Sequence, residues 1–260
     1  MIKLIASDID GTLVRDGENT LNPELYDEIL RLRAKGIQFA AASGRQWHSI
    51  ERIFDPIKEK IFYISDNGAY VGCHGRNLFL TTIERPVVME MVKDARAMEN
   101  LEIMVSGPDV VYVETKDMDF INWIVEGYRF EVKQVEDLTQ VEDQFIKISI
   151  YHKDDVENQA RALREKYRDR LKITISGNMW MDCMAQGVNK GAAIRQIQEC
   201  LEILPEETMT FGDQLNDIEM MNQAYYSYAI GNARPEVKEA ARFQADTNVN
   251  DGVLKVLRLL

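Results

Sequence analysis

The feature that most constrains this sequence is a short apolar run that ends abruptly in acids and a glycine. The run Lys3–Ser7 is followed directly by Asp8-Ile9-Asp10-Gly11-Thr12. A short apolar run bounded by a polar, glycine-containing loop is typical of a buried strand. Open α/β sheets bind ligands at the carboxyl ends of their strands, so this loop is a candidate functional site. The simpler interpretation is an acidic turn that uses glycine for a positive φ.

The segments that follow alternate between helix and strand patterns. Asn22-Pro23-Glu24 opens an amphipathic helix that closes at Gly36, and a second apolar run spans Ile37–Ala42. The alternation resumes after Gly187, with a helix from about Gly191. Later strand-like runs cover Thr208–Phe211 and Tyr226–Ile230. Such alternation predicts an α/β fold, a doubly wound parallel sheet with helices on both faces.

The middle of the chain, from about residue 83 to residue 185, has a different pattern. Short strand-like runs occur in pairs there, with a hairpin turn predicted at Gly177-Asn178 and a long polar helix over Asp154–Arg170. Hairpins mixed with helices indicate an α+β unit inserted into the first domain. We therefore predict a Rossmann-like core formed by residues 1–82 and 186–260, and an inserted α+β cap domain formed by residues 83–185.

Composition sets limits on the partners. The chain has 260 residues, which permits one large domain or two ordinary ones, and 45% of them are hydrophobic, which is ample for a core. Its 31 basic and 43 acidic residues give a formal net charge of −12, which argues against binding nucleic acid or an anionic membrane. A small phosphorylated metabolite remains possible, because it needs only a few local cations. Oligomeric state is left open by the sequence.

Location and redox state follow from two further observations. The chain reaches Asp8 too early for a secretory signal, and no window approaches 18 uninterrupted apolar residues. The three cysteines are odd in number and far apart, with no CxxC pair. We expect a cytoplasmic protein with reduced thiols and no membrane span.

A second acidic motif follows a predicted strand in the C-terminal part of the chain. Gly212-Asp213 is followed by Asn216-Asp217, about one helical turn further on. One such residue could simply cap the next helix, but capping does not need three.

Two other motifs carry cations or hydroxyls at predicted element ends. Lys190 lies where a helix begins, so its charge opposes the helix dipole, and such violations of local rules concentrate at functional sites. A solvated lysine is the simpler interpretation. Ser43-Gly44-Arg45 follows the second strand and could equally form a helix cap.

Taken together, these motifs predict phosphoryl-transfer chemistry. Four carboxylates, those of Asp8, Asp10, Asp213 and Asp217, would crowd at adjacent strand ends, and such crowding requires a cation. Because the candidate ligands are all oxygens, the natural ion is Mg²⁺.

The same residues can be given chemical roles. An ionised carboxylate can attack phosphorus and form an aspartyl-phosphate, and an acid two residues away can protonate the leaving oxygen and later deprotonate water. Ser43 and Lys190 could hold the phosphoryl oxygens.

The motifs and their order resemble those of the haloacid dehalogenase superfamily. The closing stretch, Ala229–Ala233 with Asn248–Val253, is similar to the Cof-type (subfamily IIB) sugar-phosphatase branch, as is an α+β cap between the second and third motifs. The resemblance spans essentially the whole chain. One departure is Ser43, which stands where the family more often has threonine and keeps the hydroxyl.

The resemblance implies a role for each matching residue. Asp8 would be the nucleophile and Asp10 the general acid/base. The implied Mg²⁺ ligands are the carboxylates of Asp8 and Asp213 and the backbone carbonyl of Asp10, with Asp217 supporting the metal partly through water. The implied phosphate- and substrate-binding residues are Ser43, Gly44, Lys190 and Asn216. Arg45 is a further candidate for substrate contact.

The resulting prediction is a Mg²⁺-dependent phosphatase that acts on small phosphomonoesters, foremost sugar phosphates. Two alternatives stay open: a phosphomutase-like transferase that uses the same intermediate, and a non-catalytic module that binds phosphorylated metabolites. The sequence does not name the substrate, and pyridoxal phosphate or flavin mononucleotide are also compatible with it.

Overall fold

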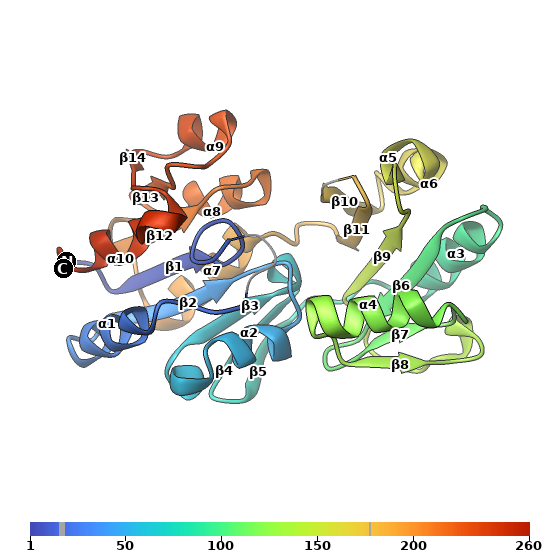
Figure 1. The fold of residues 1–260 in the computed structure, drawn as a ribbon, viewed down its shortest axis with the longest axis horizontal. Coiled ribbons are helices and arrows are strands. Elements are labelled where there is room, and N and C mark those ends of the chain that lie inside the picture. Colours follow the sequence, from blue (N-terminus) through green and yellow to red (C-terminus); the bar gives the residue numbers. More distant parts are fainter. Residues whose placement is uncertain (16–18, 177) are drawn as a thin grey trace. The chain divides into compact units, whose positions relative to one another are not determined.

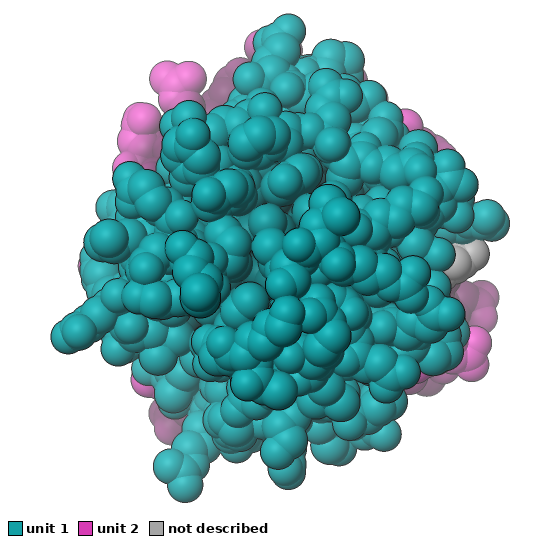
Figure 2. Space-filling view, turned by 90° about the vertical axis from the view of Figure 1, so that its left-hand side faces the viewer, with its two compact units in different colours: residues 1–79, 189–260 teal, residues 80–188 magenta. Residues whose placement is uncertain are grey.

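The computed structural model describes residues 1–15, 19–176 and 178–260 of the chain (Figure 1). These residues form two compact units. Unit 1 consists of Met1–Phe79 and Asn189–Leu260, and unit 2 consists of Leu80–Val188. Figure 2 shows the surface of unit 1 in teal. The boundaries predicted from the sequence fall after residues 82 and 185. In the described part of the chain, no helix combines the length and the apolar character needed to cross a bilayer.

Unit 1 is built on an eight-stranded sheet in which β1 is central. The strand order is β14-β13-β12-β1-β2-β3-β4-β5. Neighbouring strands from β14 to β3 run parallel, and β3 and β4 form an antiparallel pair. The strands are β1 (Leu4–Asp8), β2 (Gln38–Ala42), β3 (Phe62–Ser65), β4 (Tyr70–Cys73), β5 (Arg76–Leu80), β12 (Thr208–Gly212), β13 (Tyr226–Ala229) and β14 (Phe243–Gln244).

Helices cover both faces of this sheet because successive strand residues point to opposite sides. One face carries α1 (Pro23–Ala34), α2 (Trp47–Ile53) and α10 (Gly252–Leu257), which pack with Ile5 and Phe39. The other face carries α7 (Lys190–Leu201), α8 (Ile218–Met221) and α9 (Pro235–Ala240), which pack with Leu4 and Ala40. This arrangement confirms the predicted α/β fold with a doubly wound parallel sheet.

Unit 2 contains a six-stranded sheet in the order β10-β11-β9-β6-β7-β8. All its pairs are antiparallel except the pair formed by β7 and β8. α3, α5 and α6 pack on one face, while α4 packs with Val111 and Val113 on the other. The elements are β6 (Glu102–Ser106), β7 (Val111–Val113), β8 (Val132–Gln134), β9 (Lys147–Tyr151), β10 (Leu171–Ser176), β11 (Trp180–Ala185), α3 (Arg85–Arg96), α4 (Met118–Tyr128), α5 (Val156–Gln159) and α6 (Arg161–Tyr167).

One helix predicted in unit 2 is divided into two helices in the structure. The polar segment Asp154–Arg170 forms two helices, because Ala160 takes φ −96° and ψ 13° and interrupts the helical geometry. Ala160 is fully buried in the core of the unit, so the break serves packing that helical periodicity does not reveal. The turn predicted at Gly177-Asn178 includes Gly177, which lies outside the described residues.

Short 3₁₀ helices connect several of these elements. The third one, Leu138–Gln140, lies in unit 2, and the others lie in unit 1. They are η1 (Asp55–Lys60), η2 (Asp66–Gly68), η3 (Leu138–Gln140), η4 (Pro205–Glu207), η5 (Leu215–Asp217) and η6 (Asn248–Asn250).

The close packing of α7 against α8 depends on Gly191. An ideal Cβ at this position would lie 2.6 Å from the carbonyl carbon of Glu219, a distance that real Cβ atoms do not adopt. Gly127 in α4 is the matched case, because its Cβ would meet only Trp123 atoms at 3.9 Å.

We expect Gly191→Ala to lower the free energy of unfolding by about 1–3 kcal/mol through overpacking. Gly127→Ala should instead raise it by roughly 0.5–1 kcal/mol, because alanine is the better helix former. Thermal and urea unfolding followed by circular dichroism measures both changes. An unchanged Gly191→Ala variant would show that α7 and α8 can separate freely.

Candidate active site

The candidate site lies where the central strands of unit 1 end. β1 and β12 are parallel neighbours, so Asp8 at the end of β1 and Asp213 just after β12 come to the same edge of the sheet. Lys190 is the first residue of α7, and Asp217 ends η5. Four residues from three distant stretches of sequence thereby meet in one place.

Lys190 is the central charge of this site. Its side chain is fully buried, and Nζ donates to Oδ1 of Asp8 at 2.5 Å and to Oδ1 of Asp217 at 2.7 Å. Burial lowers the pKa of Lys190, but the charges of Asp217 and Asp8 outweigh it and hold this pKa above its ordinary value. The simpler interpretation of a solvated lysine is therefore wrong.

The start of α7 is built to hold a cation that its dipole disfavours. The side chain of Asn189 caps the helix by accepting a hydrogen bond from the Ala192 N–H at 2.7 Å. That cap satisfies one N–H group of the first turn, while the carboxylates of Asp8 and Asp217 hold the ammonium of Lys190.

Asp217 holds both Lys190 and its own loop. While Oδ1 accepts from Lys190, Oδ2 accepts backbone N–H bonds from Asp213 at 2.9 Å and Gln214 at 3.0 Å. Both carboxylate oxygens are thus engaged, which fixes the loop that carries Asp213.

Asp213 is held from the β1 loop as well. Thr12 donates to its Oδ1 at 2.7 Å, and Gln214 donates to its Oδ2 at 3.0 Å. A Cβ on Gly11 would lie 2.9 Å from Cγ of Asp213, and Gly11 has φ +82°, so this position requires glycine on two grounds. Burial raises the pKa of Asp213 to about 6.

Asp8 has the environment expected of a cation ligand. Burial raises its pKa well above the ordinary value, Lys190 lowers it, and the charges of Asp217, Asp213 and Asp10 raise it further. Its Oδ2 is buried and has no hydrogen-bond partner. Ligand oxygens of Asp8, Asp213 and Asp217 lie within 4.8 Å of one another. Three buried carboxylates and one ammonium leave negative charge that a divalent cation can balance. A set of ligands made only of oxygens suits Mg²⁺.

A second group of predicted residues gathers around Asp10. Arg45 binds both carboxylate oxygens of Asp10, through Nη2 to Oδ1 at 2.5 Å and through Nε to Oδ2 at 2.8 Å. Nη1 of Arg45 also donates to Asn19. Oγ of Ser43 accepts from the Arg45 backbone N–H at 3.1 Å and lies 3.5 Å from Oδ2 of Asp10. The described contacts of Arg45 thus include Asp10, the candidate acid/base.

Asn216 and Gly44 both lie beside Asn67, a residue that the sequence analysis did not assign to the site. Asn216 donates through Nδ2 to Oδ1 of Asn67 at 3.0 Å, and a Cβ on Gly44 would lie 3.3 Å from that amide. Asn67 lies in the 3₁₀ helix η2, between the antiparallel strands β3 and β4.

Four residues of the site were thus missed, and two of them left a signal in the sequence. Thr12 belongs to the quoted acid-and-glycine motif, and Gln214 adjoins Asp213. Asn67 and Asn19 carried none, because only the folded chain brings them to these partners. The four site residues that were not predicted are therefore Thr12, Asn19, Asn67 and Gln214.

Comparison with known proteins agrees with this geometry. A family model described as haloacid dehalogenase-like hydrolase matches residues 5–257. The 5-amino-6-(5-phospho-D-ribitylamino)uracil phosphatase YbjI of Escherichia coli is 32% identical, over 98% of this chain and 95% of the relative. YcsE of Bacillus subtilis, which has the same activity in its name, is 30% identical over 99% of this chain and 95% of its own. A crystal structure from Eubacterium rectale is similar with a TM-score of 0.94 and 35% identity, covering 99% of this chain and 98% of that one.

The fold and the site define an α/β enzyme with a buried acidic centre at the carboxyl ends of parallel strands. The chain belongs to the haloacid dehalogenase-like hydrolase family, and it is a phosphatase-type hydrolase.

The buried ion pairs of Lys190 give a prediction about stability. Lys190→Met leaves Asp8 and Asp217 without their cation, so we expect the free energy of unfolding to fall by about 3–5 kcal/mol. Adding Asp217→Asn to this variant removes one stranded charge and should restore part of the loss. Urea unfolding of wild type, single and double variants measures the coupling. If the two residues did not interact, Asp217→Asn would lower the free energy of unfolding by the same amount in Lys190→Met as in wild type. That result would contradict the pairing.

Proposed function

We propose that this protein is a Mg²⁺-dependent phosphatase that hydrolyses small phosphomonoesters through an aspartyl-phosphate on Asp8. The observation that carries the proposal is the setting of Asp8: one carboxylate oxygen bonded to Lys190 and the other buried, unpartnered and beside two further carboxylates. A binding module needs neither a nucleophile nor such an arrangement of buried charge.

The residues fit a divalent cation. Asp8 and Asp213 would hold it directly, as the family resemblance implies, and Asp217, which is bonded to Lys190 and to the backbone of its loop, would support it. The backbone carbonyl of Asp10 is the further ligand that the family resemblance implies. When bound, Mg²⁺ would offset the charge of the phosphoryl group and of the carboxylates around it.

The chain's own groups account for both halves of the reaction. An Asp8 carboxylate oxygen attacks phosphorus, the bond from phosphorus to the ester oxygen breaks, and Asp10 gives that oxygen its proton. Water then attacks the phosphorus of the aspartyl-phosphate, Asp10 takes a proton from it, and phosphate leaves with Asp8 restored. Lys190 uses two of its three N–H donors on Asp8 and Asp217, and the third can hold a phosphoryl oxygen. Ser43, Gly44 and Asn216 would bind the rest of the phosphate and substrate.

Arg45 has a different role in this proposal from the substrate contact expected from the sequence. Its two-point contact with Asp10 fixes the direction of the carboxylate, as bidentate arginine pairs do. We therefore assign Arg45 as a positioning residue for the acid/base, with Asn19 restraining the guanidinium.

The two units divide the work. Unit 1 carries every residue assigned above and acts as the catalytic core, and unit 2 acts as the cap that selects the leaving group. For the substrate, both named relatives are phosphatases of 5-amino-6-(5-phospho-D-ribitylamino)uracil. That compound carries its phosphate on a polyhydroxylated chain, as sugar phosphates do. We propose phosphomonoesters of such polyol chains as the substrate class.

A phosphate-release screen with variants tests the reaction and the metal together. The panel should include the ribitylaminouracil phosphate, sugar phosphates, pyridoxal phosphate and flavin mononucleotide, each with Mg²⁺ or with chelator. Asp8→Asn should lower turnover by about a thousandfold or more, because the nucleophile is lost. The exposed Asp55→Asn should leave it unchanged.

Further readouts separate the alternatives in that screen. Mg²⁺ should raise the melting temperature of wild type but not of Asp213→Asn, because binding to the folded state stabilises it. Formation of isomerised sugar phosphate faster than free phosphate would assign a mutase. Binding without hydrolysis across the panel would assign a non-catalytic module.

The role of Arg45 is tested by the leaving group. An alkyl phosphate needs a proton on its leaving oxygen, whereas p-nitrophenyl phosphate does not. Arg45→Met should therefore lower kcat for the alkyl ester at least about tenfold more than for the nitrophenyl ester, in the same direction as Asp10→Asn. Arg45→Lys should recover little, because it lacks the bidentate fork. Equal losses on both esters, mainly in KM, would instead return Arg45 to phosphate binding.

A further inference from the structure

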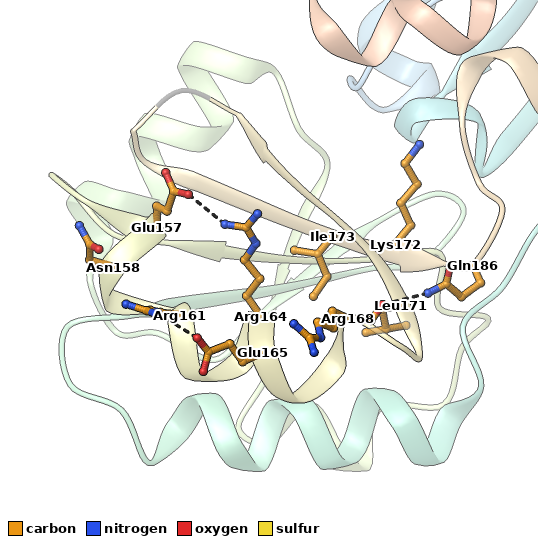
Figure 3. A pocket seen from close by; sticks show the side chains of 10 residues that line it. All are labelled: Glu157, Asn158, Arg161, Arg164, Glu165, Arg168, Leu171, Lys172, Ile173 and Gln186. Carbon is orange, nitrogen blue, oxygen red and sulfur yellow. Dashed lines mark hydrogen bonds and ion pairs between the residues drawn. The ribbon is translucent and has the colours of Figure 1, made fainter.

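Unit 2 contains a groove of about 630 Å³ that the proposed reaction does not use (Figure 3). Its walls come from α5 and α6 on one side and from β10 on the other, with Gln186 at one end. The lining residues are Glu157, Asn158, Arg161, Arg164, Glu165, Arg168, Leu171, Lys172, Ile173 and Gln186.

The groove is basic in a chain that is acidic overall. Its charged lining residues are four basic ones (Arg161, Arg164, Arg168 and Lys172) and two acidic ones (Glu157 and Glu165), whereas the whole chain has a net charge of −12. Two other cations of the same stretch, Lys166 and Arg170, serve the fold, because they pair with Glu90 of α3 at 2.9 Å and 2.7 Å. Arg161, Arg164 and Arg168 instead line the groove.

These three arginines form a stripe along α6 and its C-terminal cap, which is Arg168. Their spacing of three and four residues places them on one face of the helix, over a rise of about 10 Å. Arg161 pairs with Glu165 and Arg164 with Glu157, both at 2.9 Å, and all four side chains are about half exposed or more. Such exposed pairs contribute little to stability, so a ligand carboxylate can replace one partner at small cost.

The opposite wall is the edge of a sheet. Among the described residues, β10 has a strand neighbour, β11, on one side only. Leu171, Lys172 and Ile173 are consecutive and all line the groove. Because successive side chains of a strand point to opposite faces, three in a row mean that the edge of β10 itself borders the groove.

We propose that this groove binds an extended acidic peptide segment, which adds as a strand to the edge of β10 and places carboxylates against Arg161, Arg164 and Arg168. Same-face side chains of a strand repeat every ~6.7 Å, so two or three acidic side chains on alternate residues span the ~10 Å stripe. An edge strand can pair with a further strand and give such a peptide backbone hydrogen bonds, and the arginines give it sequence preference. A nucleic acid would use the arginines but not the strand edge, so a peptide uses more of the groove.

This proposal is independent of the phosphatase chemistry and is tested by binding alone. The probe is a fluorescein-labelled ten-residue peptide that alternates Glu and Val, titrated with the full chain in low salt and followed by fluorescence anisotropy. We expect saturable binding that weakens on raising the salt concentration. Two control peptides are a peptide of the same length that alternates Gln and Val, and the Glu/Val peptide with alternate backbone N-methyl groups. Each should bind at least about tenfold more weakly, which corresponds to about 1.4 kcal/mol of binding free energy.

Matched variants locate the site. Arg161→Ala/Arg164→Ala/Arg168→Ala should weaken binding of the Glu/Val peptide at least about tenfold. Lys166→Ala/Arg170→Ala removes cations from the same segment, but on the side that pairs with α3, and should change binding less than twofold. Circular dichroism melting of each variant checks that the fold is retained.

Four binding results would overturn the proposal. They are the absence of saturable binding, equal binding of the N-methylated peptide, equal loss in the two variants, and displacement of the peptide by an oligothymidylate of equal charge at lower concentration. Loss of a wild-type dimer in the triple arginine variant, seen by light scattering, would assign the groove to a second copy of the chain and would also overturn it.

Discussion

The site depends on one buried interaction, the ammonium of Lys190 between the carboxylates of Asp8 and Asp217. A fully buried charge is tolerated only when it is paired and hydrogen-bonded, so each of the three residues requires the other two. This requirement joins the end of β1, the start of α7 and the loop after β12. The features around it serve the same end: the Asn189 cap, the close packing at Gly191 and the backbone bonds that Asp217 accepts.

Two aspartates two residues apart have quite different surroundings, and the chemistry we propose uses that difference. Asp8 is buried, with one oxygen on Lys190 and one open to a cation, which suits a nucleophile beside a metal. Asp10 is more exposed and is held at both oxygens by Arg45, which suits a group that must be aimed at a leaving oxygen. The backbone places the two carboxylates, and their partners separate their roles.

The sequence predicted those parts of the fold that apolar runs and helical periodicity indicate locally. The parallel sheet followed from apolar runs alternating with amphipathic helices, and β1, β2, β12 and β13 lie within about a residue or two of their predicted bounds. The strands β3, β4, β5, β8 and β14 were not predicted, and the polar segment of unit 2 was predicted as one helix although Ala160 divides it into two. Short strands and helix breaks are determined by packing against residues that are distant in the sequence. The spacing of apolar residues within one segment carries no information about that packing.

By itself, the sequence determined which chemistry was possible, because the acids of the β1 loop and of the loop after β12, together with Lys190, leave few reactions other than phosphoryl transfer. Their position at strand ends followed from the same patterns, since parallel strands bring their carboxyl ends to one edge. Only the tertiary structure decided which groups are paired: Lys190 with Asp8 and Asp217, Arg45 with Asp10, and Asn216 with Asn67. Pairing depends on side-chain direction and burial between segments 27 to 182 residues apart, and neither is encoded in local spacing.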